Sequence, residues 1–222
     1  MKHRLFKGRR PFLRERCRGK RVLDVGCIEH TLEKTSHPDW LHAHLKSTAK
    51  ELVGVDYEAE IAEELNKRGY NVIVANAQDF DIRDKYPEGF DVVVAGEIIE
   101  HLTNPGLFMD CLAKHLAPGG EIILTTPNAY AFLSFLETLI LGHEQINDDH
   151  TLVFSRKMMH EFMKKAGYEV KEWYFTDYIY RYHESRFMRF LVWPMAFVQA
   201  IASIFRKEFC RTMVYVVQPK QK

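Results

Sequence analysis

The segments RVLDVGC at Arg21–Cys27 and ELVGVD at Glu51–Asp56 decide the fold. Each is a short apolar run that ends in a glycine turn or an acidic residue, which is typical of a strand buried in a parallel sheet. Gly26 stands where the backbone must pass close to something that a side chain would obstruct. Asp56 stands at a strand's carboxyl end, where a carboxylate can bind the two hydroxyls of a ribose. Together the two segments predict a doubly wound fold that binds a nucleoside cofactor.

Strand-like and helix-like segments alternate outward from these two runs. Helical spacing of apolar residues appears around residues 40–45, around 61–65, after Asn104-Pro105 and after Ser155. Asn104-Pro105 and Ser155 are good helix-start signals. Alternation of this kind predicts an α/β protein with a mostly parallel sheet. The strands are expected at 21–25, 51–56, 71–75, 90–95, 120–125, 168–174 and 212–218.

Composition places the chain among ordinary globular proteins, with 46% hydrophobic and 27% charged residues. Charge is unevenly distributed, because residues 1–21 carry ten Lys or Arg and one Glu while the net charge of the chain is +1. We interpret residues 1–20 as a solvated, partly helical basic extension before a domain at 21–222, although such a run can also contact phosphates of lipid or RNA. It has no apolar stretch and so does not resemble a secretory signal. Four scattered cysteines without a CxxC pair disfavour a structural zinc site or a disulfide framework and fit a reducing cytoplasm.

Two apolar insertions interrupt the second half of the chain, near residues 129–150 and 185–208. The first contains Tyr130–Leu141 and the second contains Phe187–Phe205, which is 19 residues long. That length is near the lower limit for crossing a bilayer, but Arg189, Pro194 and Gln199 interrupt the run. The insertions are expected either to cap the domain or to make an in-plane, peripheral membrane contact.

Five motifs in register resemble a known family. VLDVGC, GVD, NAQDF, FDVVVAGEIIEHL and LAPGGEIILTTPN occur in the order and spacing of class I S-adenosylmethionine-dependent methyltransferases, over about residues 20–127. The resemblance is strongest to the branch that includes ubiquinone-biosynthesis O-methyltransferases. It implies a Rossmann-like, doubly wound sheet of seven strands with an antiparallel last strand, and S-adenosylmethionine as cofactor.

The resemblance also implies which residues bind the cofactor. Gly26 would lie at the methionine part, Asp56 at the ribose, and the pair Asp79 and Phe80 beside the adenine. The glycine loop departs from the family pattern, because Ile28 and His30 stand where two further glycines are usual. The full set of expected cofactor-binding residues is Asp24, Gly26, Cys27, Asp56, Asp79, Phe80 and Glu97.

The string Glu97-Ile98-Ile99-Glu100-His101 is the sharpest candidate for chemistry. It follows the fourth expected strand, at the edge where open α/β sheets bind ligands. His101 can act as a general base held by a neighbouring carboxylate, or Glu97, Glu100 and His101 can coordinate a divalent metal. A similar string binds metal in small-RNA 2′-O-methyltransferases, a likeness that leaves both chemistries open. The candidate catalytic residues are Glu97, His101 and His150, the last in a polar loop that resembles the family's active-site loop.

The predicted activity is methyl transfer to an oxygen or nitrogen of a small-molecule or lipid-linked acceptor. Alternatives are an RNA methyltransferase and a non-catalytic protein on the same fold. A nucleic-acid substrate is disfavoured because no RNA-binding module is visible and the chain beyond the basic leader is acidic. The cluster of His37, His42 and His44 is interpreted as lying on the surface.

Overall fold

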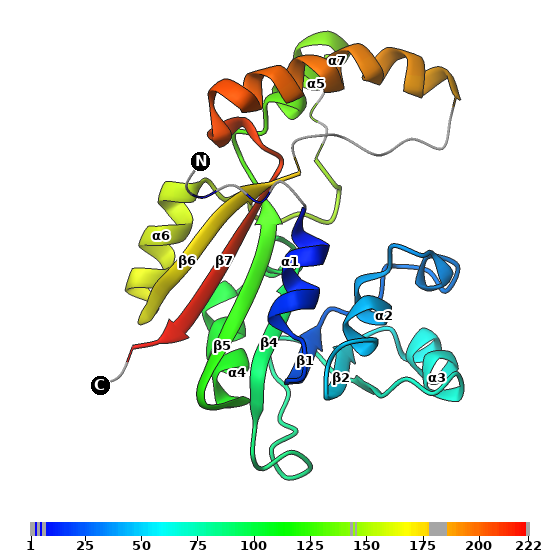
Figure 1. Ribbon diagram of the computed structural model, residues 1–222, viewed down its shortest axis with the longest axis vertical. Coiled ribbons are helices and arrows are strands. Elements are labelled where there is room, and N and C mark those ends of the chain that lie inside the picture. The colour runs from blue at the N-terminus through cyan, green and yellow to red at the C-terminus, as the bar shows by residue number, and fades with distance from the viewer. Residues whose placement is uncertain are drawn as a thin grey trace.

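A single seven-stranded sheet organises the molecule (Figure 1), in the order β3-β2-β1-β4-β5-β7-β6. The computed structural model describes residues 3, 5, 8–142, 144, 146–177 and 186–220, without the side chains of residues 141, 186–193, 195 and 196. The pairs among the first five strands are parallel, whereas β7 is antiparallel to both β5 and β6. The predicted fold class is therefore confirmed. The strands are β1 (Arg21–Val25), β2 (Glu51–Asp56), β3 (Val72–Val74), β4 (Phe90–Gly96), β5 (Leu116–Pro127), β6 (Tyr168–Thr176) and β7 (Thr212–Pro219).

The central strands are apolar throughout because both of their faces are covered. In β1, Leu23 belongs to one hydrophobic cluster and Val22 to another, and both are fully buried. Val93 and Val92 of β4 divide between the same two clusters. Successive side chains of a strand point to opposite faces, so an unbroken Val and Leu run needs helices on both sides.

Helices supply that cover. On one face lie α4 (Pro105–Lys114) and α6 (Arg156–Lys165), and on the other lie α1 (Arg9–Arg16) and α2 (Leu41–Lys46). Helix α3 (Ala59–Lys67) packs near β3.

The expected start signals are confirmed at two of these helices. The Asn104 side chain accepts from the Leu107 amide, and the Ser155 side chain accepts from the Met158 amide. Each cap satisfies an amide that the first turn of a helix leaves without an intrahelical partner.

The basic leader is not a solvated extension, which corrects the prediction from its charge. It is helical in α1, but Leu13 and Cys17 are fully buried in a cluster that includes Val92 and Val214. The Arg16 guanidinium pairs with Glu121 of β5 at 2.7 Å and with Glu172 of β6 at 2.9 Å. The prediction considered only the charges of the leader and overlooked Leu13 and Cys17, which pack against the sheet.

The two apolar insertions form helices at one end of the sheet. Helix α5 (Phe132–Leu141) and helix α7 (Arg186–Phe205) contact each other and lie beyond the upper end of the strands in Figure 1. Three short 3-10 helices complete the described elements: η1 (Lys34–Ser36), η2 (Ile99–His101) and η3 (Lys207–Phe209). Within the described part of the chain, no helix has the length and hydropathy required to cross a bilayer.

Leu13→Ala tests whether α1 is part of the core. Truncating a buried leucine loses its packing and leaves a cavity, so we expect the free energy of unfolding to fall by roughly 2–4 kcal/mol. Urea denaturation would measure it. Arg14→Ala, at an exposed position of the same helix, is the matched control. Equal, small effects of both changes would contradict the placement of α1.

Candidate functional site

The carboxyl ends of β1, β2 and β4 bring most of the predicted site residues to one edge. Val25 is paired in register with Val55 on one side and Ala95 on the other. The next residue of each strand therefore lies in the same row, which places Gly26 and Asp56 side by side with the start of the Glu97 turn. This is the edge at which open α/β sheets bind ligands.

Gly26 is required by both its backbone and its neighbour. Its φ of +74° lies in the left-handed region, and its amide donates to the Val55 carbonyl at 2.8 Å. A Cβ built at Gly26 would lie 2.7 Å from the Ile98 Cδ1 atom, too close for any real side chain. The sequence correctly indicated a close approach here, and Ile98, from the turn after β4, is the group that makes it.

Asp56 anchors the loop that follows β1. Its carboxylate is 5% exposed and accepts from the Ile28 amide at 2.8 Å and the Glu58 amide at 3.2 Å. Burial raises the pKa of Asp56, and these backbone donors oppose that rise. Each carboxylate oxygen can accept more than one hydrogen bond, so the amides leave acceptor capacity for ribose hydroxyls.

His42 is buried, which corrects its interpretation as a surface residue. It is 1% exposed, and its Nδ1 lies 2.8 Å from the Asp24 carboxylate, itself 2% exposed. Room for the ring comes from Gly54 of β2, where a Cβ would lie 3.0 Å from the His42 Cε1 atom. His37 is exposed and His44 half-buried. The missed signal was the helical spacing that places His42 on the same face as Leu45.

A tryptophan that sequence reasoning treated only as core also holds this loop. Trp40 is 1% exposed, and its indole N–H donates to the Cys27 carbonyl at 2.7 Å. Cys27 is buried, and burial, reinforced by nearby carboxylates, raises the pKa of its thiol well above the ordinary value. Cys27 is therefore a neutral packing residue, and its backbone carbonyl is the part that the loop uses.

Glu97 makes a sharp turn out of β4. Its φ is +55°, an uncommon conformation for a residue with a side chain, and its amide donates to the Thr125 carbonyl at 2.9 Å. Its carboxylate forms an ion pair with Arg9 at 2.8 Å, and Arg9 also donates to the Thr125 hydroxyl at 3.3 Å. Sequence reasoning missed Arg9 because it is one of nine Lys or Arg residues in the leader.

Glu100, His101 and His150 form a cluster of acid–base and metal-binding side chains at this edge. One ligand atom from each lies within 4.8 Å of the others. The two imidazole rings are 4.5 Å apart and nearly perpendicular. Glu100 is 2% exposed, and its Oε2 accepts from the Thr126 hydroxyl at 3.1 Å. Its Oε1 has no hydrogen-bond partner among the residues that the structure describes. A buried carboxylate oxygen without a partner is costly, which suits it to a proton or a cation.

The position of His150 depends on hydrogen bonds from the next residue. The Thr151 amide and hydroxyl both donate to the Glu100 carbonyl, at 2.9 and 3.1 Å, and the hydroxyl also donates to the Leu102 carbonyl at 3.0 Å. These bonds fasten the loop after α5 to η2. Burial, followed by the charge of the neighbouring His101, lowers the pKa of His150. A neutral imidazole can accept a proton or bind a metal.

The two acidic residues of the E-x-x-E-H string have different partners. Glu100 and His101 are grouped with His150, whereas the Glu97 carboxylate contacts Arg9. One carboxylate and two imidazoles form a mixed donor set that divalent transition metals accept, and the unpartnered Glu100 oxygen is available to such an ion. The residues present therefore fit a metal as well as a proton.

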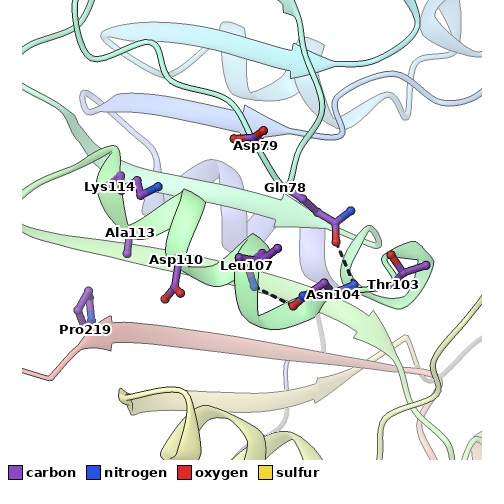
Figure 2. Close-up of a pocket in the computed structure, with 9 residues that line it drawn as sticks. All are labelled: Gln78, Asp79, Thr103, Asn104, Leu107, Asp110, Ala113, Lys114 and Pro219. Atoms are coloured by element: carbon purple, nitrogen blue, oxygen red, sulfur yellow. Dashed lines mark hydrogen bonds between the residues drawn. The ribbon is translucent and has the colours of Figure 1, made fainter.

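Asp79 and Phe80 lie apart from this group. The Phe80 ring is buried and stacks on His115, the residue that ends α4, with ring centres 4.4 Å apart. Figure 2 shows Asp79 exposed, in a groove beside Gln78 and α4, where the Gln78 side chain accepts from the Asn104 amide at 2.9 Å. Of the predicted site residues, all of which the structure describes, Asp79 alone lines this groove.

Comparison with known proteins identifies the family of the chain. A family model described as "Methyltransferase domain" matches residues 1–172. The chain belongs to the class I S-adenosylmethionine-dependent methyltransferases. The matched region includes α1, so the leader helix is part of the recognised methyltransferase pattern.

The individual relatives share only about a third of their residues with this chain over the matched region. The chain is 30% identical over 134 residues to a mitochondrial ubiquinone biosynthesis O-methyltransferase of Dictyostelium discoideum, covering 58% of this methyltransferase and 41% of the relative. It is 32% identical over 133 residues to a ubiquinone biosynthesis O-methyltransferase of Agrobacterium fabrum, covering 54% and 46%. The chain spans about half the length of the curated relatives it matches. A solved S-adenosylmethionine-dependent methyltransferase of Archaeoglobus fulgidus has the same fold, with a TM-score of 0.57, 16% identity and coverage of 97% and 96%.

The environment of Glu100 predicts a pH-dependent stability. Burial, reinforced by the charge of Glu97, raises the pKa of Glu100 from 4.5 to about 8. In the unfolded chain Glu100 loses its proton near the ordinary pKa, whereas the folded chain retains the proton to higher pH. The free energy of unfolding is therefore highest at pH values below the ordinary pKa of Glu100 and falls as pH rises toward about 8. In the presence of a chelator, Glu100→Gln should remove this loss, which is on the order of 3 kcal/mol.

Urea denaturation near pH 5 and near pH 8 would check this expectation. The exposed Glu161→Gln is the matched control and should leave the pH dependence unchanged. Parallel stability curves for the wild type and Glu100→Gln would show that Glu100 ionises normally in the folded protein.

Proposed function

We propose that this protein transfers a methyl group from S-adenosylmethionine to an oxygen of a small-molecule acceptor. One observation carries the proposal: a buried carboxylate with an unpartnered oxygen stands beside two imidazoles, at the sheet edge that holds Gly26 and Asp56. An oxygen nucleophile must lose a proton to accept a methyl group. The side chains of this cluster can accept that proton, or hold a group that lowers the pKa of the acceptor hydroxyl.

The cofactor fits the residues at the ends of β1 and β2. Asp56 is a buried carboxylate with remaining acceptor capacity, and Gly26 turns the backbone sharply at the edge. S-adenosylmethionine supplies a methyl group already activated on a sulfonium. The task of the chain is therefore to align the acceptor with that methyl group and to exclude water.

The loop residues that replace the usual glycines are accommodated. His30 has a φ of +51°, so it adopts the left-handed backbone that glycine favours. The Ile28 amide donates to Asp56, and its side chain is half-buried. This arrangement supports a retained cofactor loop over a non-catalytic protein on the same fold.

Two chemistries remain for the cluster. His101 or His150 can accept the acceptor's proton directly. Burial favours the neutral form of His150 by lowering its pKa. Alternatively, Glu100, His101 and His150 hold a divalent metal that lowers the pKa of a bound hydroxyl. We favour the metal, because it also neutralises the buried Glu100 oxygen that otherwise has no partner.

The acceptor is proposed to be a hydroxylated ring, either small or lipid-linked. Support comes from relatives named for ubiquinone biosynthesis and from the apolar helices α5 and α7 at the same end of the sheet. An RNA acceptor has less support, because Leu13 and Arg16 of the basic leader are engaged with the core and with Glu121.

Calorimetry tests cofactor and metal binding together. The protein would be titrated with S-adenosylmethionine and S-adenosylhomocysteine, first with a chelator and then with Mg²⁺, Mn²⁺ or Zn²⁺. We expect cofactor binding in each case. Direct titration of each metal ion should also show a single site, and that site should disappear in Glu100→Gln. A folded protein that binds neither cofactor would overturn the proposed function.

Kinetics of variants separate the two chemistries. Replacing His101 or His150 by Ala should lower kcat by about 10²- to 10⁴-fold if the residue handles the proton. If a metal acts, both variants and Glu100→Gln should also lose stimulation by the ion. His37→Ala, an exposed histidine, is the control. Unchanged rates in all three cluster variants would contradict the assignment.

A further inference from the structure

Over the described side chains of α7, polar residues face the protein and apolar residues face outward. Its Gln199 and Ser203 side chains are fully buried, whereas Phe197, Ile204 and Phe205 are 65%, 66% and 74% exposed. Gln199 is held by donating to the Ser203 hydroxyl at 2.8 Å and accepting from the Leu133 amide at 2.6 Å. In a helix that faces only its own core and water the polar side should face outward, so this orientation indicates an apolar medium outside.

Exposed apolar side chains occur on both α5 and α7. In α7 they recur at helical spacing, so they share one face. In α5, which contacts α7, Phe135, Leu139 and Ile140 are 59%, 68% and 61% exposed. We call this surface the apolar face, and its described members are Phe135, Leu139, Ile140, Phe197, Val198, Ile201, Ile204 and Phe205.

The charged residues in and just after α7 are mostly basic. Residues 186–211 contain five Lys or Arg and a single acid, Glu208, and the one acid of α5, Glu137, is buried. Acidic residues do follow α5, in the loop at 144–149, but α5 is ten residues long and its first turn is the one bonded to α7. The acids therefore follow the carboxyl end of α5, whereas the basic residues gather at the carboxyl end of α7.

This pattern discriminates among occupants. Two copies meeting through the carboxyl end of α7 would bring two segments of net positive charge together, which is repulsive. A bilayer with anionic headgroups offers both an apolar interior for the apolar face and negative charge for the basic residues. We propose that α5 and α7 form a docking face for an anionic lipid surface, on which the protein lies without crossing it.

Docking there would place the candidate site next to the lipid surface. The chain runs from the end of α5 directly into the loop that carries His150, and Thr151 fastens that loop to Glu100. At the other end of α5, Asn128 bonds to the Glu208 and Cys210 carbonyls that follow α7. The proposal goes beyond methyl transfer and does not depend on it.

Vesicle sedimentation of the full chain tests the docking face. The probes are phosphatidylcholine vesicles with and without phosphatidylglycerol. We expect the wild type to pellet with the anionic vesicles and less with the neutral ones. Ile201→Gln combined with Ile204→Gln should lower vesicle partition by about tenfold or more, because two apolar side chains are lost from the contact.

Two further variants isolate the cause. Met158→Gln removes an exposed apolar side chain from α6 and should leave vesicle binding unchanged. Arg206→Glu should remove the preference for phosphatidylglycerol. Circular dichroism and S-adenosylhomocysteine binding report whether each variant is folded, independently of vesicles.

Three results would overturn the docking face. The first is a wild type that stays in solution with both kinds of vesicle. The second is equal pelleting of the wild type and the Ile201 and Ile204 double variant. The third is a wild-type dimer, seen by analytical ultracentrifugation, that the double variant dissociates, which would assign the face to a second copy of the chain.

Discussion

The two-sided burial of β1 and β4 is the constraint on which the rest of the structure depends. Because Val22 and Leu23 belong to different hydrophobic clusters, helices must cover both faces of the sheet. Helices placed there as crossovers keep the strands parallel and deliver their carboxyl ends to one edge. The chemistry of that edge follows from strand register, since Val25 is paired with Val55 and Ala95 at once.

Long-range hydrogen bonds then adjust what the register places together. Thr151 fastens one loop to η2, Trp40 holds another by the Cys27 carbonyl, and Asp56 holds the Ile28 amide. Each bond uses a backbone group that would otherwise lie unpaired near the site. The loops at this edge are therefore held in place by hydrogen bonds to one another and to the sheet. Such fixed loops suit a site that must align two reactants.

The sequence predicted features that depend on neighbouring residues, such as strands and helices. It did not predict features that depend on contacts between residues far apart in the chain. Apolar runs and helix caps predicted the strands and most helices, because these depend on neighbours within a few residues. Burial of His42 depends on Gly54 in another element, and the seat of Leu13 depends on β7. The pairing of Glu97 with Arg9 crosses 88 positions, and no pattern in a run of basic residues distinguishes Arg9.

The seat of α1 has a consequence for how the chain reaches its fold. Leu13 lies in a cluster with Val214 and Val216 of β7, so the helix near the beginning of the sequence packs against the strand near its end. During synthesis α1 emerges early, but the cluster that covers its apolar side stays incomplete until β7 has been made and inserted between β5 and β6. Contacts of such sequence separation slow folding and leave apolar surface open to other molecules in the meantime. Strand β7 thus completes the core on both faces of the sheet.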